Sequence, residues 1–131
     1  MQTYATELWH SRLPEGWLLE EDEDSVSFFH PDGPGVLCIT CSCKEEGLVD
    51  ETDLEEFAAE LLEKGLEPAH VSIGHLRGLL FEYEEGNEWW REWYLACDDL
   101  FFFITYNCDP DDRGREDATV SQILHNIEVI Q

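Results

Sequence analysis

Residues 100–104 form the apolar run Leu-Phe-Phe-Phe-Ile, directly after the turn signal Asp98-Asp99. Successive side chains of a β-strand point to opposite faces of the sheet, so a strand with this sequence is apolar on both faces. Such a strand lies in the middle of a sheet that is covered on both sides. This segment therefore predicts a layered fold with the sheet between two covering layers.

Turn residues divide much of the chain into segments of strand length. Glu85-Gly86-Asn87 and Asp98-Asp99 are typical of hairpin turns, and the run Pro31-Asp32-Gly33-Pro34-Gly35 is a further turn signal. The strands predicted from this pattern cover residues 17–21, 25–30, 36–44, 69–73, 78–84, 88–96 and 100–107. Because hairpins join neighbouring strands, the sheet is expected to be mostly antiparallel.

The clearest helical pattern covers residues 50–64. Its apolar stripe, with the spacing i, i+3, i+4, i+7 and i+8, consists of Leu54, Phe57, Ala58, Leu61 and Leu62. Asp50 is placed to cap the first turn, and a capping box from Thr52 to Glu55 is the alternative. Gly65 and Pro68 predict the end of the helix.

A second helix is predicted over residues 117–126, where Val120, Ile123 and Leu124 recur at helical spacing. Residues 1–12 are ambiguous and fit either a short helix or a loose arm. We therefore predict an α+β fold, a mostly antiparallel sheet of six to seven strands sandwiched by two or three helices, in a single domain spanning residues 1–131. A half-open barrel is the alternative, and the doubly apolar strand argues against it.

Two further stretches of the sequence are distinctive together. The first is Leu13-Pro14-x-Gly16-Trp17 followed by a strand that ends in a Pro-Asp-Gly turn. The second is the run from Gly78 to Tyr83 that leads into a Trp-rich strand. With the predicted order of strands and helices, these stretches resemble the Mog1/PsbP-like superfamily. The resemblance spans residues 13–130 and implies an antiparallel sheet sandwiched by helices. It also implies a role in binding proteins rather than in catalysis, and it assigns no binding residue in this chain.

The chain carries 31 acidic and only seven basic residues, a formal net charge of −24. Such a charge is typical of disorder, but 43% of the residues are apolar, which is enough for a folded core. A surface of this charge repels nucleic-acid phosphates and anionic lipids, so we expect neither nucleic-acid nor membrane binding. It attracts basic protein surfaces. The alternatives are that the charge serves solubility alone or adaptation to high salt.

Trp89, Arg91 and Trp93 alternate along one predicted strand and therefore share one of its faces, while Trp90, Glu92 and Tyr94 share the other. Trp, Tyr and Arg are enriched in the residues that dominate binding interfaces, so the Trp89–Arg91–Trp93 face is a candidate partner-binding surface. In that arrangement the two indoles hold Arg91 between them by cation–π attraction. The alternative is a structural strand under a helix, with Arg91 paired to a carboxylate.

An uninterrupted acidic run is the second candidate for partner binding, and it consists of Glu20, Glu21, Asp22, Glu23 and Asp24. Residues 109–114 resemble a calcium loop only faintly, because Arg113 occupies the fifth ligand position and Val120 the twelfth. We interpret that segment as a solvated turn before the second helix.

The five cysteines predict no metal site and no disulfide framework. In a strand, Cys38 and Cys41 point to opposite faces, whereas Cys41 and Cys43 share an apolar face and are expected to be buried. The scattered histidines and the missing nucleophile and phosphate-binding motifs indicate no catalytic residues and no cofactor. The first eleven residues lack the pattern of a signal peptide, so we expect a cytoplasmic protein with reduced thiols.

Three hypotheses follow for function. The first is a non-enzymatic domain that holds a basic protein partner, such as a bacterial immunity protein that masks a cationic toxin, or a companion of a secreted effector. The second is a small enzyme that uses cysteine or carboxylate chemistry in a pocket. The third is a housekeeping domain whose charge serves only solubility.

Overall fold

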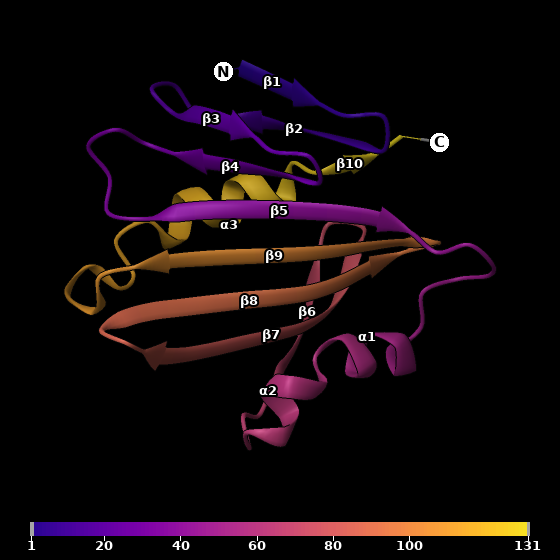
Figure 1. The fold of residues 1–131 in the computed structure, drawn as a ribbon. Coiled ribbons are helices and arrows are strands. Elements are labelled where there is room, and N and C mark those ends of the chain that lie inside the picture. Colours follow the sequence, from indigo (N-terminus) through magenta and orange to yellow (C-terminus); the bar gives the residue numbers. More distant parts are fainter. Residues whose placement is uncertain (1, 131) are drawn as a thin grey trace.

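The computed structural model describes residues 2–130. Its centre is a seven-stranded antiparallel sheet with the strand order β3-β4-β5-β9-β8-β7-β6 (Figure 1). The strands are β3 (Leu18–Glu21), β4 (Ser25–Phe29), β5 (Val36–Cys43), β6 (Ala69–Ile73), β7 (Leu76–Glu85), β8 (Glu88–Cys97) and β9 (Leu100–Cys108). The predicted α+β fold is confirmed, and each predicted strand agrees with the structure to within two residues at either end.

The strand that contains the run at residues 100–104 is β9, and it is the central strand of the sheet, as predicted. Leu100, Phe102 and Ile104 point to one face, where each is at most 4% exposed. Phe101 and Phe103 point to the other face and pack against a second group of buried residues. Both faces are thus covered over residues 100–104, which explains why this part of β9 has no polar side.

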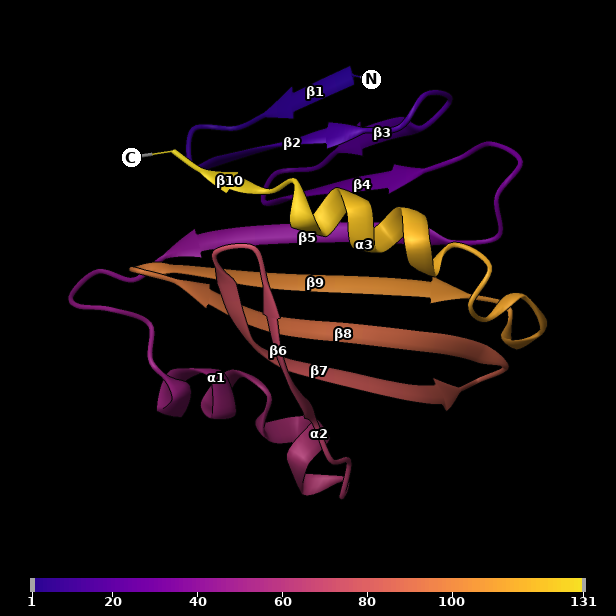
Figure 2. The ribbon, with the colours of Figure 1, turned by 180° about the vertical axis from the view of Figure 1, so that it is seen from behind.

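One face of the sheet is covered by α3 (Asp117–His125) together with a small sheet of β1 (Gln2–Ala5), β2 (Trp9–Leu13) and β10 (Glu128–Val129) (Figure 2). The expectation of a helix or a loose arm at residues 1–12 is wrong for residues 2–12, and Met1 lies outside the described residues. Trp9, Ser11 and Leu13 alternate as buried residues, which is the period of a strand. The Ser11 hydroxyl donates to the Ile123 carbonyl oxygen of α3 at 2.8 Å, which lets a polar residue occupy the buried position.

The opposite face is covered only over β7, β8 and the first residues of β9, by α1 (Glu51–Phe57) and α2 (Ala59–Glu63). Asp50 caps α1 as predicted, but its capping box closes with Asp53 rather than through the alternative at residues 52–55. The single predicted helix is divided at Ala58, although the Ala58 and Leu62 amides still donate to carbonyls four residues earlier. Beyond these helices, no helix in Figure 1 crosses β4, β5 and β9 on the side turned to the viewer.

We call this incompletely covered side the open face. Strand register places two rows of side chains on it. One row contains Glu20, Ser27, Cys38, Thr105, Glu92 and Phe81, and the other contains Val36, Asn107, Trp90 and Tyr83. The two-residue turn Gly86-Asn87, in which both residues have positive φ, fixes the register that places Glu92 opposite Phe81.

Candidate functional site

The acidic run lies at the far edge of the sheet from α1 and α2. Glu20 and Glu21 end β3, and Asp22, Glu23 and Asp24 form the turn to β4, where all five side chains are exposed. The other acidic residues include six of the twelve residues of α1 and α2. They also include five of the ten strand residues of β7 and β8 nearest their hairpin, residues 81–85 and 88–92. Carboxylates therefore lie at both edges of the sheet, and charge alone does not single out one binding face.

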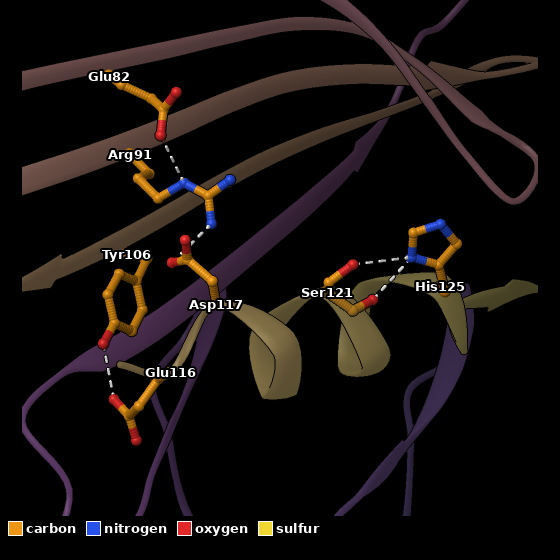
Figure 3. A network of polar contacts seen from close by, with 7 residues as sticks. All are labelled: Glu82, Arg91, Tyr106, Glu116, Asp117, Ser121 and His125. Carbon is orange, nitrogen blue, oxygen red and sulfur yellow. Dashed lines mark hydrogen bonds and ion pairs between the residues drawn. The ribbon is translucent and has the colours of Figure 1, made fainter. Parts of the chain in front are cut away.

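The side of β8 that carries Trp89, Arg91 and Trp93 faces α3. Figure 3 shows Arg91 pointing toward Asp117 at the start of α3. Trp93 is only 2% exposed and belongs to the core on this side. The Arg91 guanidinium lies 4.6 Å from the centre of the Trp93 ring and pairs with Glu82 at 3.1 Å and Asp117 at 3.5 Å. Arg91 is thus held by two carboxylates and one indole.

Trp89 does not complete the expected arrangement of Arg91 between two indoles. Its ring is covered instead by the Arg113 guanidinium at 5.0 Å. The reason is the strand register, because Trp89 pairs with Cys108 and the segment after Cys108 therefore lies beside it. The structural alternative, a strand beneath a helix with a paired Arg91, describes this face. Partner binding by Trp89, Arg91 and Trp93 stays a prediction.

The opposite side of β8 contains a buried carboxylate without a basic partner. Glu92 is 9% exposed, and it accepts hydrogen bonds from the hydroxyl of Tyr94 at 2.8 Å and from the hydroxyl of Tyr83. No Lys or Arg among residues 2–130 forms an ion pair with it. Burial, followed by the hydrogen bond to Glu92, raises the pKa values of Tyr83 and Tyr94, so both remain neutral donors.

Glu92 lies at a pocket of about 570 Å³ between α1–α2 and the open face, which we call the Glu92 pocket. Aromatic side chains form much of its lining: Phe57, Tyr83, Tyr94, Phe101 and Phe103. Glu60, Glu85 and Lys64 also line it. Strand alternation places Glu92 and Tyr94 on one face, but neither residue was predicted from the sequence to belong to a site. The usable signal was the Gly86-Asn87 turn, whose register places Tyr83 diagonal to Glu92 across the hairpin.

A second polar cluster, of which Figure 3 shows Tyr106 and Glu116, holds the turn between β4 and β5. The Tyr106 hydroxyl donates to Glu116 at 2.7 Å, and the Gly35 amide donates to the same carboxylate at 3.1 Å. A β-carbon at Gly35 would clash with the Tyr106 ring, so the close approach of this turn requires glycine. The cluster joins three distant segments and is structural.

Ser121 and His125 form the pair most similar to a nucleophile and its base (Figure 3). The Ser121 hydroxyl lies 3.3 Å from His125 Nδ1, but the same nitrogen lies 2.8 Å from the Ser121 carbonyl oxygen. A carbonyl only accepts, so Nδ1 donates to it and is not free to take a proton from the hydroxyl. The pair is a local contact within α3.

The cysteines do not form a metal site in the part of the chain that the structure describes, where no group of three His, Cys, Asp or Glu side chains is arranged to hold an ion. Cys41 is half-buried, and burial raises its pKa to about 12. Cys43 is exposed, contrary to expectation, because it lies at the end of β5; its thiol donates to Asp99 at 3.2 Å, which raises its pKa.

No family model matches the chain, and no curated protein matches it. Solved structures do. A protein from Bacteroides thetaiotaomicron VPI-5482 superposes with a TM-score of 0.72 at 19% identity, over 94% of this chain and 45% of that one. The chain thus spans less than half the length of that protein.

Two further structures match at 13% identity. Cyanobacterial PsbP (CyanoP) from Synechocystis sp. PCC 6803 has a TM-score of 0.50, over 98% of this chain and 92% of its own. LpqN, described as involved in cell envelope biogenesis of Mycobacterium tuberculosis, has a TM-score of 0.56, over 94% and 83%. The chain has the Mog1/PsbP-like fold. At these identities the likeness concerns the Mog1/PsbP-like fold alone, not function.

No helix in the described residues is both long enough and apolar enough to cross a membrane.

Proposed function

We propose that this protein is a non-enzymatic binding domain that holds a basic protein partner. The observation that carries the proposal is the uncompensated charge. Four of the seven basic residues form ion pairs, Lys44, Lys64, Arg91 and Arg115, and together they engage five carboxylates. Subtracting these five from 31 leaves 26 carboxylates without a Lys or Arg ion-pair partner in the described structure.

An acidic surface of this kind speeds the encounter with a basic protein and repels acidic competitors. An immunity protein that masks a cationic toxin, or a companion of a secreted effector, requires this property. In either role the acidic run at residues 20–24 extends the attraction to the far edge of the sheet, and the encounter takes place in the cytoplasm.

The test is affinity capture from extracts of the source organism at salt concentrations of about 0.05 M and about 0.5 M, which differ several-fold in screening length. We expect one or a few basic proteins to be retained at low salt and released at high salt. The matched control replaces Glu20, Glu21 and Glu23 by Gln and Asp22 and Asp24 by Asn, and it should retain less. Capture of no basic protein at low salt would contradict the proposal and favour a charge that serves solubility alone.

A further inference from the structure

The Glu92 pocket combines aromatic walls with a carboxylate that lacks a counter-charge. Phe57 is 54% exposed at its edge and stacks on Phe101 with ring centres 4.3 Å apart. Tyr94 lies between Phe101 and Phe103, with ring centres at 6.4 and 5.2 Å. The electron-rich faces of such rings attract cations, most of all where water is excluded.

The Glu92 carboxylate has capacity for further hydrogen bonds. A carboxylate offers about four acceptor sites, and the two tyrosine hydroxyls occupy two of them. Burying a carboxylate costs free energy unless donors and an opposite charge offset the loss of water. The tyrosines supply donors but no positive charge, so the site is electrostatically incomplete in the isolated protein.

The surroundings of the pocket are also negative. Glu60 and Glu85 oppose the single charge of Lys64, which lies 3.9 Å from Glu60 and is about half exposed. With Glu92 included, the charged residues of the lining sum to −2, three acidic groups against one basic group. Acidic residues of α1–α2 and of the β7–β8 hairpin flank the pocket, so the field there favours a cation and disfavours phosphate or carboxylate.

We propose that the Glu92 pocket receives an arginine side chain of the basic protein partner, and this proposal rests on the proposed function. A guanidinium is planar, so it stacks on the partly exposed Phe103 ring while its N–H groups donate to the Glu92 carboxylate. A lysine ammonium is a compact point charge that is more strongly hydrated, so it fits this combination of ring faces and carboxylate less well. The neighbouring open-face residues Trp90 and Thr105 then contact the rest of the partner.

The test uses a defined probe, a peptide of three arginines blocked at both ends, titrated into the whole protein at low salt and followed by NMR. We expect the ring signals of Tyr83, Tyr94 and Phe103 to shift. A peptide with citrulline, the uncharged isostere, should not bind. Glu92→Gln should weaken binding about tenfold, the typical effect of losing one charge-assisted hydrogen bond. Glu15→Gln removes the same charge from an exposed turn before β3 and should change affinity little.

Two outcomes overturn this site. If Glu92→Gln and Glu15→Gln weaken binding equally, the peptide is attracted by the overall negative charge and not by the Glu92 pocket. The proposed function then stands, but the Glu92 pocket is not the binding site. If the tri-arginine peptide leaves the rings of the pocket unshifted, the pocket does not receive arginine, whatever the capture experiment retains. Lys64→Gln gives an independent check on an exposed residue, because removing the competing positive charge should strengthen binding.

Discussion

Arg91 and Glu92 are neighbours in β8, and their side chains lie on opposite faces of the sheet. The two residues differ in whether their charge has an ion-pair partner. On the α3 side, the positive charge of Arg91 is matched by Glu82 and Asp117 and shielded by the Trp93 ring. On the open side, Glu92 accepts hydrogen bonds from two phenols and forms no ion pair with a basic residue in the part of the chain that the structure describes. The first arrangement is complete within the fold, whereas the second has no Lys or Arg ion-pair partner among residues 2–130.

The residue types most typical of binding interfaces are structural in β8. Trp and Arg are common in binding interfaces, yet Trp93 is a core residue here and Arg91 completes an internal ion pair. The less conspicuous Glu92 is the buried charge that the fold leaves unmatched. A buried charge without its partner is costly, so its presence is better explained by function than by stability.

The largest effect on the α3 side should come from Trp93→Ala. Trp93 is 2% exposed and packs among core residues beneath α3, so its removal leaves a cavity. We expect a loss of about 3–5 kcal/mol in the free energy of unfolding, measured by urea denaturation. A loss below about 1 kcal/mol, typical of a surface site, would show that this side of β8 is not structural.

The tyrosines on the open side predict a dependence of stability on alkaline pH. Burial, then hydrogen bonding to Glu92, raises the folded-state pKa values of Tyr83 and Tyr94 above the ordinary value of 10.0. The unfolded chain therefore loses these protons first, and stability should fall as the pH rises above 10.0 toward the folded-state values.

Glu92→Gln should change the pKa values of the tyrosines on the open face but not that of Tyr106 on the other face. It removes the charge that Tyr83 and Tyr94 share, so the absorbance titration should show two tyrosines ionising at lower pH than before. Tyr106 donates to Glu116 on another part of the molecule and should keep its raised pKa. A Tyr106 shift as large as those of Tyr83 and Tyr94 would mean that the variant loosens the whole fold.

A smaller effect on the free energy of unfolding should distinguish Arg91 from Glu92. Arg91→Met should lower the free energy of unfolding by about 1 kcal/mol, because the cation–π contact and partly exposed ion pairs are lost. Glu92→Gln should lower it less, or raise it, because the variant keeps a side chain of the same shape and removes an unmatched buried charge. Urea denaturation of both variants at neutral pH measures the difference, and a Glu92→Gln cost equal to that of Arg91→Met would remove the distinction between the faces.

Local patterns predicted the main sheet well because its hairpins are short. The two-residue turns Gly86-Asn87 and Asp98-Asp99 require positive φ, and the apolar run at residues 100–104 fixes the central strand. The small sheet was missed because Ser11 interrupts its apolar alternation. The hydroxyl of Ser11 is satisfied by Ile123, 112 residues away, and no local pattern contains that contact.

The candidate site depended on non-local packing in the same way. Alternation predicted that Arg91 and Glu92 face opposite sides, but not which side α3 would cover. Because α3 covers one side, Arg91 pairs with Asp117 there. Because α1 and α2 are short, the side that carries Glu92 stays partly open. The hairpin register placed Tyr83 near Glu92, so a search for carboxylates diagonal to tyrosines would have found this cluster.

The smallest expected effect is a footprint on the cysteines when the tri-arginine peptide or a captured basic partner is bound. Cys38 lies on the open face in the same row as Glu92, separated from it by Thr105, whereas Cys43 is exposed at the end of β5 on the other face. A large partner docked on the open face should slow alkylation of Cys38 in proportion to the bound fraction and leave Cys43 unchanged, as measured by mass spectrometry. The short peptide confined to the Glu92 pocket should protect Cys38 less than the whole partner does. Protection of Cys43 instead of Cys38 would place the partner on the α3 side and reverse the assignment of the two faces.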